Sequence, residues 1–311
     1  MKREVFSILT AAVIISATFI SCKMDSENDK EYQMIMTTSS SNEVYFDIYG
    51  SGTATIDLGD GLGKQVVNIT DYPNSTGRFY HEYSYEASRT ITISGKNITH
   101  FECAGQGQLT SLDVSNNPAL IHLVCANNKL TSLDVSNNPA LIYLDCSVNR
   151  LKSLDVSKNT ALTYLGCSLN QLTSLDLSSC TELTTVWCHS NNDLTSLNLS
   201  GCTKLTELYC YGNGLISLNL SDNVALEIVF CRRNPLTGLN LSKNTKLRCL
   251  DCRWSELDAD LLNVLFETLH DNEGNNDEKK IISIYGNPGI YDCDQSIAED
   301  KGWTFYNTSQ I

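Results

Sequence analysis

Cysteine is the residue type in this chain with the most evident capacity for chemistry, since thirteen of the 311 residues are cysteines. Eight recur at intervals of 21 or 22 residues: Cys103, Cys125, Cys146, Cys167, Cys188, Cys210, Cys231 and Cys252. Zinc needs four ligands around one point, which one cysteine per repeat does not supply. Parallel neighbouring strands also aim two sulfurs poorly for a disulfide. The spacing therefore predicts a ladder of buried, reduced thiols that fill an apolar core.

Three further cysteines need separate interpretations. Cys249 and Cys252 form a CxxC pair, but residues three apart on a strand face opposite ways, so we expect no metal there. Cys180 and Cys202 occupy a slot that is asparagine in most other repeats. An oxidised Cys180–Cys202 pair suits an exported protein, and two reduced thiols are the alternative that we favour.

The remaining residues form no recognised catalytic motif. The sequence contains no GxSxG, HExxH or phosphate-loop pattern. His100 and His122 are expected on adjacent strands beside Glu102, where simple surface exposure is favoured over a metal site. We therefore predict no enzyme activity, no metal and no cofactor. The net charge of −14 argues against nucleic acid as a partner, because an acidic surface repels phosphate.

A frame of 21 residues must position these cysteines. Its second half reads LxxLxCxxNxL, as at 120–130, and its first half reads LxxLxVxxN, as at 109–117. Alternation in each half predicts a short strand, with Leu123 and Cys125 pointing inward. The second half resembles the leucine-rich repeat signature, and the nested pattern resembles the bacterial class called IRREKO. The resemblance implies a mainly β fold, a solenoid of about eight coils over residues 98–257 with strands on both sides.

Aromatic residues gather at the outward positions of the LxC strands. The inward pattern does not require these rings, so we predict that they form an exposed ligand-binding patch with cations, Arg233 included, at one edge. Its residues are Tyr143, Tyr164, Trp187, His189, Tyr209, Tyr211, Phe230, Arg232 and Arg253. Cross-strand packing that only stabilises the sheet is the alternative.

The opposite side of the coil is polar. Asp113, Asp134, Asp155 and Asp176 recur there between serines, at a spacing of about 4.8 Å per coil. The frame lacks the glycine-rich loops of calcium-binding β-rolls, so a solubilising face is the favoured interpretation. Short strands on both sides also predict a straighter solenoid than a helix-backed one, and stacking must bury the leucines, since no coil can do so alone.

Both ends of the solenoid depart from the repeat. Residues 32–97 contain alternating stretches with glycine turns, which predict a small β-sandwich. ATIDLGDG followed by FYHEYS resembles a PKD-type immunoglobulin-like domain, and a β cap over the first coil is the alternative. Residues 258–311 combine DADLLNVLFETLH, with helical apolar spacing, and the strand-like IISIY and WTF. They predict an α/β cap over the last coil.

The first 22 residues predict export. MKR precedes the uncharged run VFSILTAAVIISATFI, and Cys22 ends the segment, which is the pattern of a signal peptide. FISC resembles a bacterial lipobox, which implies lipidation of Cys22; ordinary cleavage near Ser21 is the alternative. Residues 23–31 are polar and acidic and are typical of a flexible tether. They resemble the surface-export signal of Bacteroidetes lipoproteins.

These features favour an exported outer-membrane lipoprotein at the cell surface, held to the membrane by an N-terminal lipid anchor. The sequence resembles Bacteroidetes leucine-rich repeat surface lipoproteins. We expect an adhesin-like or ligand-capture module whose aromatic face binds a protein or a glycan, because rings can anchor peptides or stack on sugars. A passive structural surface component is the second hypothesis, and an enzyme is the third.

Overall fold

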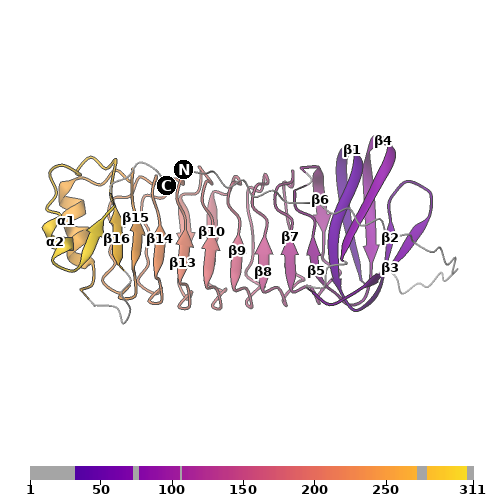
Figure 1. Cartoon of the computed structure of the whole chain (residues 1–311), viewed down its shortest axis with the longest axis horizontal. Coiled ribbons are helices and arrows are strands. Elements are labelled where there is room, and N and C mark those ends of the chain that lie inside the picture. The colour runs from indigo at the N-terminus through magenta and orange to yellow at the C-terminus, as the bar shows by residue number, and fades with distance from the viewer. Residues whose placement is uncertain (1–31, 73–76, 106, 272–278, 307–311) are drawn as a thin grey trace, which may run out of the picture.

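The computed structural model describes residues 32–72, 77–105, 107–271 and 279–306. The predicted signal peptide, its Cys22 and the tether lie outside these described residues. The molecule is elongated, and its short strands stand side by side along the long axis (Figure 1). The repeated sequence forms the middle of this row, and the two segments that depart from the repeat form its ends.

The LxC half-units form parallel strands along the solenoid. They pair in register, so that Leu123 lies beside Leu144 and Leu144 lies beside Leu165. The strands are β5 (Ile98–Glu102), β7 (His122–Val124), β8 (Tyr143–Asp145), β9 (Tyr164–Gly166), β11 (Thr185–Trp187), β13 (Glu207–Tyr209), β14 (Ile228–Phe230) and β15 (Cys249–Asp251). The inward leucines are fully buried. The predicted mainly β, leucine-rich repeat solenoid is confirmed.

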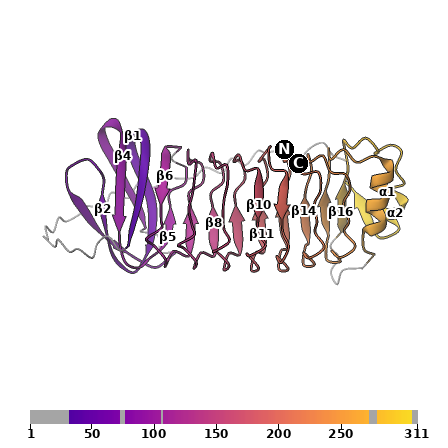
Figure 2. The same cartoon turned by 180° about the vertical axis from the view of Figure 1, so that it is seen from behind.

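The other side of each coil carries the LxxLxV half-unit. Its apolar residues pack against the LxC strands, and Leu130, Leu133 and Val135 are all buried. Regular strands form there at β6 (Leu109–Asp113), β10 (Ser174–Asp176) and β12 (Ser196–Asn198). Because neither side of the coil carries helices, neither is wider than the other, and the coils stack in the nearly straight row seen in Figures 1 and 2.

A ladder of asparagine side chains joins successive coils at one turn. Asn149 donates at 3.0 Å to the carbonyl groups of Cys125 on the preceding coil and of Cys146 on its own coil. Its Oδ1 accepts a hydrogen bond from the Leu130 N–H, also at 3.0 Å. The amide nitrogens of the equivalent asparagines make the same two bonds at Asn128, Asn170, Asn191, Asn213 and Asn234. Buried backbone groups that no strand pairs are satisfied in this way.

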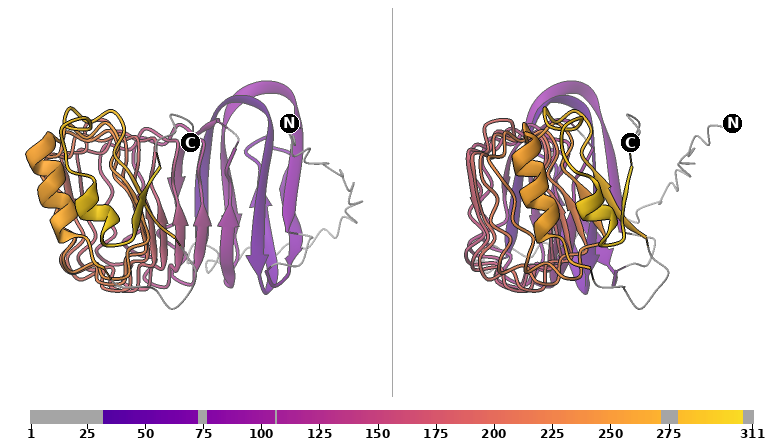
Figure 3. Two further views of the ribbon diagram at one scale, coloured as in Figure 1. Left: turned by 60° about the vertical axis from the view of Figure 1, so that its left-hand side comes forward. Right: turned by 90° about the vertical axis from the view of Figure 1, so that its left-hand side faces the viewer.

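The N-terminal segment is all β, as predicted, but its described strands belong to the same sheet as the solenoid rather than to a separate β-sandwich. Its strands are β1 (Gln33–Gly50), β2 (Gly52–Asp57), β3 (Lys64–Ile69) and β4 (Arg78–Ser94). β1 pairs antiparallel with β4, and also with β5 and β6 on the two sides of the first coil. Figure 3 shows these indigo and purple strands arching over that end. The segment therefore covers the first coil, and its PKD-like identity stays a prediction.

The C-terminal segment closes the other end as an α/β cap, as predicted. α1 (Ala259–Thr268) begins after Asp258, whose carboxylate accepts the Leu261 N–H at 2.9 Å. β16 (Lys280–Ser283), α2 (Ser296–Glu299) and β17 (Trp303–Phe305) follow. Within the described residues, no helix has both the length and the apolar character needed to cross a membrane.

The parallel sheet continues into this cap, which the repeat pattern does not predict. β16 pairs in register with β15 on one side and with β17 on the other. Ile282, Ile284 and Asn287 take the places of leucine, cysteine and asparagine in the frame, and Asn287 donates to the Cys252 carbonyl. Isoleucine in the cysteine position, together with the insertion that contains α1, hid this coil in the sequence.

Candidate functional site

The most distinctive surface of the molecule is formed by the outward side chains of the LxC strands, which are β5, β7, β8, β9, β11, β13, β14 and β15. This surface is called the strand face. In-register pairing places them in columns along the solenoid. In the first column His122 lies beside Tyr143, and Tyr143 lies beside Tyr164. In the second column Trp187 lies beside Tyr209. These are the columns that the repeat predicts.

Rings in the first column stack nearly parallel. Ring centroids lie 4.4 Å apart between His122 and Tyr143 and 4.3 Å apart between Tyr143 and Tyr164, with interplanar angles of 12° and 4°. The stack continues through His100 to Tyr72, whose ring lies 4.6 Å from that of His100. Neighbouring strands are separated by about 4.8 Å, which falls within the range of centroid distances that packed aromatic rings prefer. In-register pairing of the strands is therefore enough to stack the rings of neighbouring coils.

The series of packed rings continues from Tyr164 in the first column to Trp187 in the second, in the middle of the solenoid. The whole series, called the ring ladder, consists of Tyr72, His100, His122, Tyr143, Tyr164, Trp187, Tyr209 and Phe230. Gly166 has no side chain in the second column, and the next coil fills that column with Trp187. Centroid distances are 6.1 Å from Tyr164 to Trp187 and 5.2 Å from Trp187 to Tyr209, at angles of 56° and 61°. Phe230 extends the series 5.2 Å beyond Tyr209. Trp187 is 40 % exposed, so this part of the ladder meets solvent.

A third column runs beside the second, one residue past each cysteine. His189 and Tyr211 stack at 4.2 Å with an angle of 7°, and the guanidinium of Arg232 lies 4.5 Å from the Tyr211 ring centroid. Burial, and then the charge of Arg232, lowers the pKa of His189, so its imidazole is neutral at physiological pH. Tyr211 is held between its neighbours on the two adjacent coils.

Ring stacking along the solenoid determines which parts of the aromatic side chains are accessible to a ligand. Tyr143 and Tyr211 each have a flat group on both sides along their column, so ring edges and hydroxyl groups, rather than ring faces, point outward. Burial raises the pKa of Tyr143 and of Tyr164, so these hydroxyls stay protonated and can both donate and accept hydrogen bonds. The face presents rigid ring edges and hydroxyls whose side-chain freedom is already restricted.

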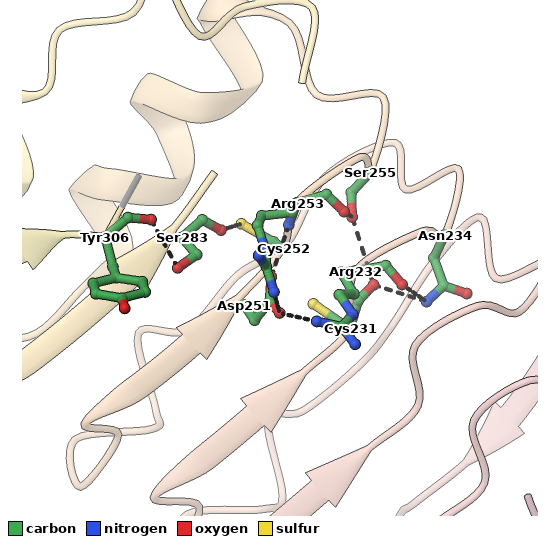
Figure 4. A network of polar contacts seen from close by, with 9 residues as sticks. All are labelled: Cys231, Arg232, Asn234, Asp251, Cys252, Arg253, Ser255, Ser283 and Tyr306. Atoms are coloured by element: carbon green, nitrogen blue, oxygen red, sulfur yellow. Dashed lines mark hydrogen bonds and ion pairs between the residues drawn. The ribbon is translucent and has the colours of Figure 1, made fainter. Parts of the chain in front are cut away.

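The sequence predicts Arg253 as an exposed cation, and the structure shows that this is wrong. Only 1 % of Arg253 is exposed. Its Nε and Nη2 atoms each donate at 2.8 Å to the Asp251 carboxylate, which also pairs with Arg232 at 3.3 Å (Figure 4). A buried guanidinium needs a charged partner, and Asp251 in the second column provides it. Arg253 therefore holds the carboxylate of Asp251 in place at the end of the strand face and is not accessible to a ligand.

The other predicted ligand-binding residues lie together on this one face. They are Tyr143, Tyr164, Trp187, His189, Tyr209, Tyr211, Phe230 and Arg232. The structure adds Tyr72, His100 and His122 to one end of the ring ladder. The two histidines can be found from their columns in the repeat. Tyr72 follows β3, outside any repeat, so no periodic signal in the sequence places it here.

The cysteine ladder is buried, as predicted. Its eight side chains are fully inaccessible and its thiols are free. Burial raises the pKa of each of these thiols, so none is a reactive thiolate at neutral pH. In the part of the chain that the structure describes, no cluster of three or more His, Cys, Asp or Glu side chains could hold a metal ion.

Cys180 and Cys202 are buried free thiols at a different turn. At the equivalent position Asn159 donates at 2.9 Å to two carbonyl groups, those of Val135 and Asn138. Cys180 instead places its sulfur 3.4 Å from the Val156 carbonyl, a weaker interaction. Two reduced thiols stay the prediction that we favour for this pair.

The acidic column on the opposite side has a local structural role. Asp134 accepts a hydrogen bond from the Ser136 N–H at 2.9 Å, and Asp155 does the same with Ser157. Hydrogen bonds from these serines lower the pKa of both carboxyl groups. The carboxylates therefore stabilise turns while they solubilise that side.

Comparison with known proteins agrees with this fold. No protein-family model matches the chain, and no curated protein matches it. Among solved structures it is similar to the functional domain of InlJ from Listeria monocytogenes, which includes a cysteine ladder, with 32 % identity and a TM-score of 0.53. That similarity covers 70 % of this chain and 50 % of the InlJ chain. Internalin C2 from the same species is 20 % identical, with a TM-score of 0.48, over 54 % of this chain and 77 % of that chain.

A cysteine ladder is a feature that InlJ and this chain share. Both proteins carry a cysteine ladder, and here the ladder lies in the core between the two sides of the coil. The chain spans half the length of that InlJ structure. By its fold and its repeated frame, the chain is a leucine-rich repeat protein, similar to a protein of the internalin type.

Proposed function

We propose that this chain is a binding module that captures a protein ligand on its strand face. The observation that carries the proposal is the ring ladder, in which aromatic side chains on consecutive coils pack against one another outside the core. The buried leucines and cysteines complete the core without them. Rigid aromatic residues are enriched among the residues that dominate protein–protein binding energy.

The orientation of the rings favours a protein over a glycan. A sugar that stacks on an aromatic side chain needs an open ring face, whereas Tyr143 and Tyr211 have both faces covered by neighbours. Ring edges and hydroxyls suit the mixture of apolar side chains and backbone carbonyls that a protein surface offers. Trp187, 40 % exposed, is the best-placed anchor on the face.

We further propose that the module is exported and lipid-anchored at the outer surface of the cell through Cys22. Support for this comes from the sequence alone, from the apolar run that ends in FISC and the acidic tether after it. Replacing Cys22 with alanine should release the protein from the membrane fraction. Retention of the variant in that fraction would contradict a lipid anchor at this residue.

Parallel screening on protein and glycan arrays tests the ligand class. The purified chain should bind one or more proteins in a salt-tolerant manner and should bind no glycan. Binding to glycans alone would contradict the protein-ligand proposal. Binding to neither would favour the second hypothesis, a passive structural component whose rings only stabilise the sheet.

A further inference from the structure

A groove lies at the edge of the strand face, beside the third column. Its lining includes Ser190, Asn192, Tyr211, Gly212, Arg232 and Arg233. These residues come from the turns that directly follow β11, β13 and β14, where the chain leaves the strand face. The stacking of Tyr211 between His189 and Arg232 makes one wall of the groove rigid.

Arg233 differs from the other arginines at this end of the solenoid. Arg232 and Arg253 both pair with the carboxylate of Asp251 (Figure 4). Arg233 is exposed, and its guanidinium lies 5.2 Å from the ring centroid of Trp254. Among the described residues it makes no ion pair with a carboxylate. Trp254 thus restrains the guanidinium through its flat face while the N–H groups at its rim stay available.

The backbone at Arg233 does not explain why arginine is there. Arg233 has φ of 56°, in the left-handed region, and this turn position has positive φ on the neighbouring coils too. Gly212 fills it on the preceding coil with φ of 66°, without strain. The turn would form at least as well with glycine. The same position carries asparagine, valine, leucine, serine and tryptophan on other coils, so the turn itself sets no requirement for arginine.

We propose that the groove binds a carboxylate group of the protein ligand, with Arg233 as its principal contact. The inference rests on the proposed function and specifies the chemistry of one contact within it. A guanidinium presents two parallel N–H groups that match the two oxygens of a carboxylate. Tyr211 lines the same groove. Arg233 is an exposed cation at this edge of a chain whose net charge is −14, and its charge guides an acidic group to the groove.

The carboxylate can come from an acidic side chain or from a chain terminus, and three acetylated tetrapeptides separate the sources. One carries a glutamate side chain and an amidated end. The second carries glutamine and a free terminal carboxylate, and the third carries glutamine and an amidated end. Calorimetric titration of the purified full chain at low salt should show that at least one carboxylate peptide binds about tenfold or more tightly than the third. Equal binding, or no binding, of all three peptides would overturn the proposal.

Matched arginine variants assign the effect to the groove. Arg233→Gln should abolish the preference for carboxylate peptides, whereas Arg150→Gln should leave it intact. Arg150 is an exposed arginine that does not line the groove, so its loss changes the net charge equally. A preference that survives Arg233→Gln, or is lost equally in both variants, would show that no specific contact exists. If the chain captures a protein on the array but does not prefer carboxylate peptides, only the groove proposal fails. If it prefers carboxylate peptides but captures no protein, only the proposed function fails.

Discussion

The hydrogen bonds of single asparagine side chains link each coil to the next. Each LxC strand is only about three residues long, so its ladder satisfies few backbone groups. At the turn after each strand, Asn149 and its equivalents supply donors and an acceptor to buried backbone groups on two coils at once. The aliphatic core provides the driving force for stacking, and these amides fix the register in which coils stack.

Replacing Asn149 with alanine should therefore destabilise the solenoid strongly. The Leu130 N–H would lose its partner inside the core, and leaving such a group unsatisfied costs about 1–3 kcal/mol. We expect a loss of at least about 2 kcal/mol in the free energy of unfolding, measured by urea denaturation. Asn192→Ala, at an exposed asparagine, should change it by less than about 0.5 kcal/mol. Equal effects of the two substitutions would contradict the role given to the ladder.

The buried thiols make the protein sensitive to alkali. Burial raises the pKa of every ladder cysteine in the folded state, while an exposed thiol of the unfolded chain titrates at about 8.5. Above that pH the unfolded state binds fewer protons than the folded state, so the free energy of unfolding falls as pH rises. The full contribution is present below about pH 8.

The size of the effect follows from the number of thiols. Each contributes a loss of up to about 1.4 kcal/mol per pH unit, so the eight together contribute up to about 11 kcal/mol per unit, comparable to the whole stability of a typical domain. We expect urea midpoints, measured with a reducing agent present, to change little from pH 7 to 8 and to fall steeply from pH 9 to 10. The double variant Cys146→Ala and Cys167→Ala should show a shallower slope. A flat profile up to pH 10 would contradict the burial of the thiols.

At the scale of elements, periodic parts of the chain could be predicted and non-periodic parts could not. The strands carrying Leu123 and Cys125 follow from alternation, and α1 follows from its apolar spacing and from Asp258. The coil around Ile284 was missed because isoleucine replaces cysteine and α1 lengthens the connection. The burial of Arg253 could not be predicted because it depends on a pairing with Asp251, the last residue of β15, and the frame alone gives no pairing.

The cap Asp258 offers a test at this scale. Its carboxylate accepts the Leu261 N–H and so satisfies one of the free donors at the start of α1. Asp258→Ala should lower the free energy of unfolding by about 1 kcal/mol and speed amide exchange in α1. Asp260→Ala, in the first turn of the same helix, removes a carboxylate but no cap and should cost less. A larger loss from Asp260→Ala would contradict the capping role.

At the scale of the whole molecule, one sheet runs from the N-terminal arch to the C-terminal cap. Both open ends of the core are covered, by β1 and β4 at one end and by α1, α2 and β17 at the other. Because each coil is fixed to its neighbours, side chains on the strand face are held at constant spacing. A rigid face of this kind loses little entropy on binding.

The sequence predicts which residues of the candidate site lie beside one another, but it does not predict which atoms of their rings face solvent. Register follows from the repeat, so the sequence places Tyr143 beside Tyr164 and Trp187 beside Tyr209. Ring tilt depends on side-chain packing, which decides that edges rather than faces point outward from Tyr143. Tyr72 joins the ladder from a segment without any repeat, so only the three-dimensional structure reveals it.

The central claim is that rings of the strand face bind a ligand without supporting the fold. Its most direct test measures capture of an array-identified protein and thermal stability together for Trp187→Ala with Tyr209→Ala. A control carries Ser174→Ala with Ser196→Ala, at exposed positions on the opposite side of the coil. We predict that the ring variant loses at least about a hundredfold in affinity, in line with hot-spot losses, and keeps its melting temperature within a few degrees, while the control matches the wild type. Unchanged capture by the ring variant would contradict the claim.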